Sequence, residues 1–318
     1  MTIREAAKND YEAIIDIRNN QNIPWPEQLR TAEALRNADA RRNPKYIYKR
    51  FIAEEVGVPV GVGAFAEQGT YNGKPQFSIN IAVREAFRGK GIGTALYDAV
   101  FNELKDKTGA VIRADGFTLY PRGMKFLEKQ GFKEVWRETP VELDVSFCDL
   151  SGLNGLLSKL AGQGIAIRSL AELNDDPDRN RKLFEAYTKM SPQVPSEEGY
   201  IWETPDFDEW MEYQINDPST LLESYFVAVY DNRYIGLKEV GMLPGTNAIQ
   251  CGLMAVLPEY QHKGIAKAMQ LKTIDYARKI GCPVLKSCTA TCNTPMQQLY
   301  EKLGYVKRYE WAQYMMEL

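Results

Sequence analysis

The chain of 318 residues lacks several features that would assign it to a special class of protein. Met1 leads into Thr2-Ile3-Arg4-Glu5 without a basic stretch and an apolar run, so no signal peptide is expected. No run approaches the roughly 18 apolar residues of a membrane helix, which predicts no membrane association. The five cysteines are odd in number and lack Cys-x-x-Cys spacing, so neither a disulfide framework nor a metal site is expected. These absences predict a reducing, cytoplasmic location.

The charge and composition also exclude some functions. A net charge of −3 and a pI near 5.6 argue against a dedicated nucleic-acid-binding protein. The apolar fraction of 44% and charged fraction of 25% are typical of a globular protein. The length is about twice the common domain size of roughly 150 residues. Two domains are therefore predicted.

An internal repeat supports this division. The segment Arg88-Gly89-Lys90-Gly91-Ile92-Gly93 resembles Gln261-His262-Lys263-Gly264-Ile265-Ala266, and Leu127–Phe132 resembles Tyr300–Tyr305. Glycines 91 and 264, and glycines 131 and 304, are separated by the same offset of 173. A repeat of this length indicates duplicated domains. We therefore predict an N-terminal domain over 1–147, a glycine-rich linker over 148–164 and a C-terminal domain over 165–318.

Each copy shows the same order of predicted elements. In the C-terminal copy, alternation predicts a strand meander, which helical spacing from Gly264 to Gly281 follows. A strand, a second helix and a last strand complete the copy. The predicted C-terminal strands and second helix are Tyr225–Tyr230, Tyr234–Met242, Ala248–Val256, Val284–Thr289, Pro295–Leu303 (helix) and Tyr305–Met315. The N-terminal counterparts are strands Phe51–Ala53, Val58–Glu67 and Phe77–Val83 and a helix from Gly91 to Leu104. The fold class is α/β (α+β), with a mixed, mostly antiparallel sheet flanked by helices in each domain.

The repeated glycine loop lies where a strand gives way to a helix. The first N–H groups of a helix lack backbone acceptors and favour an anion, so this loop suits a pyrophosphate. Neither loop reads Gly-x-Gly-x-x-Gly or Gly-x-x-x-x-Gly-Lys-Ser/Thr, and a meander precedes each one, which argues against dinucleotide and nucleoside triphosphate binding. Both loops do read Arg/Gln-x-x-Gly-x-Gly/Ala.

That pattern resembles the signature of the GNAT superfamily of acetyltransferases, in a tandem-domain form. Near the C-terminus, Asn293, Met296 and Leu299–Tyr305 resemble the second coenzyme-contacting motif of the family. The resemblance covers nearly the whole chain and implies acetyl-CoA (coenzyme A) as the acyl donor. The coenzyme-contacting positions that it implies in the C-terminal copy are Met254, Ala255, Val256, Gln261, His262, Lys263, Gly264, Ile265, Ala266, Lys267, Asn293 and Met296. Those in the N-terminal copy are Ala82, Val83, Arg88, Gly89, Lys90, Gly91, Ile92, Gly93 and Thr94.

The resemblance also implies that the two copies differ in activity. Tyr300 matches the tyrosine that protonates the departing coenzyme A thiolate, while the offset of 173 places Leu127 at that position in the first copy. Tyr120 likewise replaces Asn293. A tyrosine with a pKa near 10 suits this proton donation, although a core aromatic residue on an amphipathic helix is the alternative for Tyr300. The C-terminal copy is therefore expected to be catalytic, and the N-terminal copy is expected to be degenerate.

Candidates for the acceptor side follow from charge and position. Glu239 is the candidate general base because its predicted strand precedes the one that carries Ala255, although a solvent-facing carboxylate is an equal alternative. Trp202 and Glu203 open a segment where acids alternate with aromatic residues, which suits a cationic amine or simply starts an acidic helix. His262, the only histidine, lies in the phosphate loop and is not expected to be a base.

These observations predict an N-acetyltransferase that acts on a primary amine of a small, cationic molecule by direct attack. The alternatives are a coenzyme A-binding or sensor protein without catalysis, and a peptide or protein N-acetyltransferase. We expect a monomer or homodimer, with no nucleic-acid partner, no membrane partner and no metal.

Overall fold

The computed structural model describes residues 1–21, 31–243 and 245–318, which form two compact units. The first unit contains residues 1–137, 198–200 and 310–318, and the second contains residues 138–197 and 201–309. Each unit holds a mixed sheet with helices against it, which confirms the predicted fold class. The division differs from the predicted one at both ends of the C-terminal copy.

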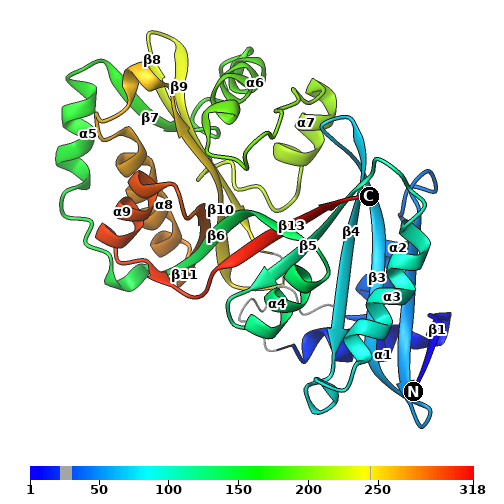
Figure 1. Cartoon of the computed structure of the whole chain (residues 1–318). Coiled ribbons are helices and arrows are strands. Elements are labelled where there is room, and N and C mark those ends of the chain that lie inside the picture. The colour runs from blue at the N-terminus through cyan, green and yellow to red at the C-terminus, as the bar shows by residue number, and fades with distance from the viewer. Residues whose placement is uncertain (22–30, 244) are drawn as a thin grey trace. The chain divides into compact units, whose positions relative to one another are not determined.

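The first unit has a sheet in the order β1-β2-β3-β4-β5-β13 (Figure 1). All described neighbours are antiparallel except β4 and β5, which are parallel. Helix α3 lies against β2, β3 and β4. The elements are β1 Thr2–Glu5, α1 Tyr11–Asn19, α2 Ala32–Ala40, β2 Tyr48–Glu55, β3 Val58–Tyr71, β4 Lys74–Val83, α3 Ile92–Leu104, β5 Val111–Phe117, α4 Pro121–Lys129 and β13 Trp311–Glu317.

The second unit has the order β6-β11-β10-β9-β8-β7, with β12 also on β6. Phe226, Ala228 and Ile235 pack with residues of α5 and α8, whereas Val227 and Leu237 pack with residues of α6 and α7. Figure 1 shows these helices beside the sheet. Alternation places Val227 on the other face from Phe226 and Ala228. A register shift beside Ile235 places Ile235 and Leu237 on different faces, although they are two residues apart. The elements are β6 Lys133–Asp144, α5 Leu153–Ala161, β7 Ile165–Ser169, α6 Arg179–Met190, α7 Phe207–Gln214, β8 Phe226–Tyr230, β9 Arg233–Met242, β10 Ala248–Val256, α8 Ile265–Lys279, β11 Val284–Ala290, α9 Thr294–Lys302 and β12 Val306–Lys307.

The two copies exchange a strand along the sequence. Strand β13, from the end of the chain, pairs antiparallel with β5 of the first unit. The second half of β6 pairs antiparallel with β11 of the second unit, from Asp144 with Val284 to Glu138 with Ala290. The single last strand expected over Tyr305–Met315 is therefore two strands, β12 and β13, which belong to different units. Sequence repeats record the order of elements, not their pairing partners, so the exchange was not predicted.

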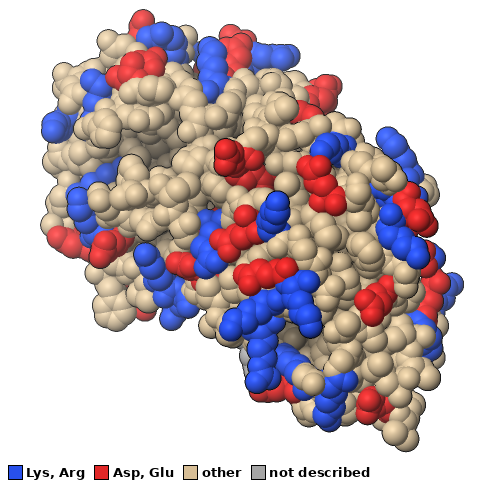
Figure 2. All heavy atoms as spheres, viewed as in Figure 1, with Lys and Arg blue, Asp and Glu red and all other residues tan. Residues whose placement is uncertain are grey.

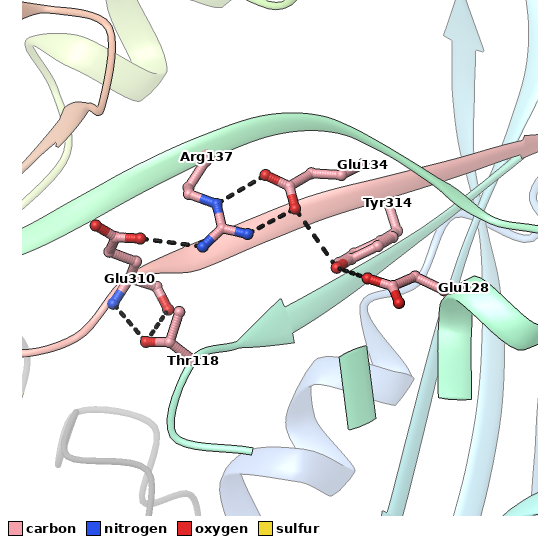
Figure 3. Close-up of polar contacts among 6 residues, drawn as sticks. All are labelled: Thr118, Glu128, Glu134, Arg137, Glu310 and Tyr314. Atoms are coloured by element: carbon pink, nitrogen blue, oxygen red, sulfur yellow. Dashed lines mark hydrogen bonds and ion pairs between the residues drawn. The ribbon is translucent and has the colours of Figure 1, made fainter. Parts of the chain in front are cut away.

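A polar cluster holds the returning end of the chain in the first unit (Figure 3). Arg137 donates from Nε and Nη2 to the two carboxylate oxygens of Glu134, at 2.7 and 2.6 Å, and from Nη1 to Glu310 at 3.0 Å. The Tyr314 hydroxyl donates to Glu128 at 3.2 Å, and burial raises the pKa of Tyr314 to about 12. The arginine holds the pKa of Glu134 below its usual value. These contacts fix β13 beside the start of β6.

The segment predicted as a linker has structure of its own. Helix α5 lies within it and buries Leu153 and Leu160. It packs against α8 and β7 of the second unit. Glycines 152 and 162 lie just outside the helix ends, whereas Gly155 lies inside it. The glycines indicated a flexible connection, but the apolar face of α5 makes this segment part of the second unit.

Acidic and basic side chains are interspersed over the face drawn in Figure 2. This mixture agrees with the near-neutral net charge of −3. Among the described residues, no helix is long and apolar enough to cross a membrane.

Candidate functional site

In the second unit, the pairing of β10 with its neighbouring strands is interrupted. Its antiparallel register with β9 shifts between Cys251 and Met254, so Gly252 and Leu253 form a β-bulge. On its other edge, β10 pairs with β11 only from Ala248 to Gln250, although β10 continues to Val256. The two strands therefore part after Gln250. At the bulge, the Leu253 N–H is not used in pairing with β9. Beside it, the edge of β10 that faces β11 is unpaired after Gln250.

Glu239 of β9 uses the donor at the bulge. The Leu253 N–H donates to Glu239 Oε2 at 3.1 Å, while Oε1 is buried and has no hydrogen-bond partner among the described residues. Burial raises the pKa of Glu239 to about 7, against the lowering effects of the Leu253 N–H, the Lys238 charge and the Tyr225 hydroxyl. A carboxyl with this pKa can gain and lose a proton near neutral pH.

A cavity of about 260 Å³ lies against Glu239. Its described lining includes two carboxylates, Asp217 and Glu239, and no lysine, arginine or histidine. The hydroxyl and backbone N–H of Ser219 donate to Asp217 and lower its pKa, so Asp217 is ionised at neutral pH. The lining residues are Tyr213, Gln214, Asp217, Ser219, Thr220, Tyr225, Glu239, Val240, Gly241, Met242, Leu243, Gln250 and Gly252. The negative lining favours a cationic ligand.

Gly252 keeps the bulge and the carboxylate in contact. A Cβ atom at this position would lie 2.8 Å from Glu239 Oε2 and 3.0 Å from Glu239 Cβ. We expect Gly252→Ala to displace the carboxylate and lower kcat by about 10- to 100-fold, because small misplacements of reacting groups are costly. Steady-state kinetics measure this effect.

Gly155→Ala is the matched control, because a Cβ there meets nothing within 4 Å in helix α5. It should leave kcat unchanged. A folded Gly252→Ala protein with wild-type kcat would contradict the role given to the bulge.

Tyr300 of α9 lies at the point where β10 and β11 part. It is buried, at 4% exposure, and its hydroxyl lies 2.6 Å from the Ser287 hydroxyl. Burial raises the pKa of Tyr300 well above its ordinary value. The Ser287 hydroxyl in turn lies 3.5 Å from the carbonyl oxygen of Cys251. The predicted proton donor and the predicted base thus lie at the same break in the sheet.

The glycine loop before α8 has the geometry of an anion site. Gly264 is the N-cap, in the left-handed region at φ 94°, and no side chain caps the helix. The N–H groups of the first turn therefore lack a side-chain acceptor. Gln261 donates to the Val256 carbonyl at 2.9 Å and ties the loop to the end of β10. His262 has a φ of 60°, so its backbone makes a left-handed turn in the loop.

The remaining predicted coenzyme contacts lie at the start of α9. Asn293 is its N-cap, and its side-chain oxygen accepts from the Met296 N–H at 3.3 Å. The first turn of α8, the open edge of β10 at Met254–Val256 and the start of α9 all belong to the second unit. These residues fit a pyrophosphate with a thioester arm, and their coenzyme contacts stay a prediction.

The first unit keeps the glycine loop but differs from the second unit in the strands beside it. Gly91 caps α3 in the left-handed region, and Arg88 Nε donates to the Val83 carbonyl at 3.0 Å, as Gln261 donates to Val256. Strands β3 and β4, however, pair without a shift from Gly61 with Val83 to Glu67 with Phe77. No bulge releases an N–H group over this described stretch.

The strand registers identify the residue of the first unit that is equivalent to Glu239. Val83 pairs with Gly61, and Val256 pairs with Gly236. Three residues further along each partner strand are Ala64 and Glu239, so the first unit has alanine in place of the carboxylate. With Leu127 in place of Tyr300, this unit lacks both predicted catalytic groups.

The structure does not bring the predicted acceptor residues Trp202 and Glu203 into the cavity. Trp202 stacks edge-on against Tyr187, with ring centroids 5.8 Å apart, and Glu203 is exposed. Asp217 and Gln250 line the cavity instead. Sequence reasoning missed them because they come from a loop and a strand that only the tertiary fold brings together.

Comparisons with known proteins agree with this geometry. The profile of the acetyltransferase (GNAT) family matches residues 11–132 and 181–305, one region in each copy. The chain belongs to the GNAT family of acetyltransferases, and it contains the family fold twice.

Among the described residues, no group of three or more histidine, cysteine, aspartate or glutamate side chains could hold a metal ion.

Individual relatives are distant. An uncharacterized N-acetyltransferase, YjgM, of Escherichia coli strain K12 is 27% identical over 155 residues, which is 47% of this chain and 86% of the relative. The structure of a GCN5-related N-acetyltransferase from Sphaerobacter thermophilus has a TM-score of 0.71 at 16% identity, covering 99% of this chain and 95% of that one. A tandem GNAT protein from the clavulanic acid biosynthesis pathway has a TM-score of 0.64 at 16% identity, covering 99% and 98%. These likenesses show the fold.

Proposed function

We propose that the C-terminal copy transfers an acetyl group from acetyl-CoA to a primary amine of a small, cationic molecule. The observation that carries this proposal is the position of Glu239. The Glu239 carboxyl lines the acidic cavity. Its Oε1 has no hydrogen-bond partner among the described residues, and its Oε2 accepts from the Leu253 N–H in the bulge of β10. An ammonium group in the cavity can therefore lose its proton beside the strand edge that would hold the thioester.

Each group has a defined task in direct attack. Acetyl-CoA supplies an acetyl group activated as a thioester. The open edge of β10 would offer N–H groups to the developing oxyanion. Glu239 takes a proton from the ammonium group, Asp217 attracts the cation, and Tyr300 gives a proton to the leaving sulfur. Direct attack of the amine on the thioester forms no covalent acyl-enzyme intermediate.

The alternative functions fit the site less well. A coenzyme sensor without catalysis gives no reason for a carboxyl with a pKa of about 7 beside a bulge. A peptide acceptor needs an extended groove, whereas the cavity has a volume of about 260 Å³. Both alternatives are outcomes of the acceptor experiment below.

The acceptor experiment measures thiol release from acetyl-CoA with diamines, amino sugars, amino acids and short peptides. We expect turnover with small cationic amines and a higher KM for them in Asp217→Asn, with kcat little changed. Turnover with peptides alone would replace the proposed acceptor class. Binding of acetyl-CoA without turnover on any amine would favour the sensor.

If only the C-terminal copy is catalytic, alanine substitutions of the two helix-capping glycines should have different effects on activity. Gly264 and Gly91 cap their helices at φ 94° and 81°, so alanine is strained at both, by about 1 kcal/mol or more. A Cβ at Gly264 would also lie 2.9 Å from Leu156 Cδ1. We expect Gly264→Ala to raise the KM for acetyl-CoA by about 10-fold.

Gly91→Ala should leave that KM unchanged. It should also lose less thermal stability than Gly264→Ala, because a Cβ at Gly91 meets nothing within 4 Å. A raised KM in Gly91→Ala alone would assign the working coenzyme site to the first copy.

A further inference from the structure

Ser287 has no part in the proposed mechanism so far, but it lies against its proton donor. Ser287 is 1% exposed on β11, and its Oγ atom is 2.6 Å from the Tyr300 hydroxyl oxygen. The last paired residues of β10 and β11 are Gln250 and Lys286. The next residue on each strand is therefore Cys251 or Ser287. The two hydroxyls lie at the vertex where the strands part.

The direction of this hydrogen bond matters for catalysis. Tyr300 has one proton, and it can protonate a sulfur only if that proton is not donated to Ser287. Ser287 can instead donate its one proton to the Tyr300 oxygen, because either oxygen can act as donor and the competing acceptor, the Cys251 carbonyl, is farther away at 3.5 Å. Burial raises the pKa of Tyr300, and the hydrogen bond from Ser287 opposes this effect. The serine thus favours the form of Tyr300 that has lost its proton.

We propose that Ser287 is a positioning residue for Tyr300, holding the phenol at the strand vertex and stabilising it while its proton moves to the leaving thiolate. This inference rests on the proposed function. In the step, the carbon–sulfur bond breaks and its electron pair stays on sulfur. The Tyr300 O–H bond then breaks, and a sulfur–hydrogen bond forms. The negative charge moves to the phenolate oxygen, which accepts from Ser287, and a proton from water restores the phenol afterwards.

The first unit provides an internal comparison. At the same offset of 173, Ala114 of β5 replaces Ser287 and Leu127 of α4 replaces Tyr300. Both are buried, at 7% exposure, so this position remains in the core but has no hydroxyl pair. The copy that lacks the phenol also lacks its partner, as expected if the serine acts through the tyrosine.

A double-mutant cycle separates this role from a purely structural hydrogen bond. We expect Ser287→Ala to lower kcat by about 10-fold, with the KM for acetyl-CoA within about 2-fold of wild type. In a Tyr300→Phe background, Ser287→Ala should lower kcat by less than about 2-fold, because two residues that act as one unit are not additive. Thr273→Val is the control: it removes another fully buried hydroxyl, whose donor bond goes to the Met269 carbonyl.

The outcomes are distinct. Thermal unfolding measures the stability of every variant, and Thr273→Val should lose stability but not kcat. Equal fold losses for Ser287→Ala in both backgrounds, or an effect on KM alone, would overturn the positioning role. If wild type turns over and Tyr300→Phe is fully active, the acid role of Tyr300 fails and Ser287 has nothing to position. If wild type does not turn over any amine, the proposed function itself fails.

Discussion

Tyr300→Phe is expected to lower kcat by about 100-fold or more while leaving the KM for acetyl-CoA nearly unchanged, because positioned proton donors contribute about 10²- to 10⁴-fold. The substitution removes one oxygen from a buried ring and keeps the packing of α9. Without the phenol, the thiolate must leave unprotonated or take its proton from water. Stopped-flow or steady-state thiol release measures the loss.

Tyr305→Phe is the control for this experiment. Tyr305 is also buried, its ring centroid lies 4.7 Å from that of Tyr300, and its hydroxyl accepts from Gln270. Its loss leaves a buried amide with one fewer partner, which costs about 1–3 kcal/mol of stability. We therefore expect Tyr305→Phe to lose stability but keep its kcat. The opposite pattern would assign the proton donation to Tyr305.

Glu239→Gln is expected to lower kcat/KM by about 10²- to 10⁴-fold at pH 8. The pKa of Glu239, about 7, places its active carboxylate form above neutral pH. In wild type, kcat/KM should therefore fall about 10-fold for each pH unit below 7, and Glu239→Gln should lose this limb of the profile. Glu185→Gln, an exposed carboxyl on α6, should keep the wild-type profile.

Glu239→Gln, which should lower activity, should raise stability at alkaline pH. The folded pKa of Glu239 lies above its ordinary value of 4.5, so the stability that it contributes is complete below pH about 4.5. That contribution is lost as the pH rises through 7, where the buried carboxyl becomes charged. Glu239→Gln should therefore gain unfolding free energy relative to wild type at pH 8 but not at pH 4.5. Equal stability differences at both values would contradict burial of the charged form.

The sequence predicted much of the fold because its signals are local. The glycines at 91 and 264 and the helical spacing after them predicted both glycine loops, and both glycines cap their helices in the left-handed region. The exchange of β13 and the second half of β6 depends on which strand edges are open, and such pairing leaves no mark in a repeat. For the same reason, the expected last strand was assigned to the wrong unit.

The site was partly predictable. Glu239 could be named as a candidate because its predicted strand precedes the one that carries Ala255, and Tyr300 because it matches the second coenzyme-contacting motif of the family. The bulge at Gly252 could not be named, because a glycine in a strand has several meanings. Asp217, Gln250 and Ser287 reach the cavity or the strand vertex only through tertiary packing. Their residue types carry no signal of their own.

The most direct test of the account compares thiol release by wild type, Gly264→Ala, Gly91→Ala and Tyr300→Phe with one acceptor amine at saturating concentration. We predict turnover by wild type and Gly91→Ala, a raised KM for acetyl-CoA in Gly264→Ala, and a loss of about 100-fold in kcat for Tyr300→Phe. Wild-type kcat in Tyr300→Phe, or loss of turnover only in Gly91→Ala, would contradict catalysis by the C-terminal copy.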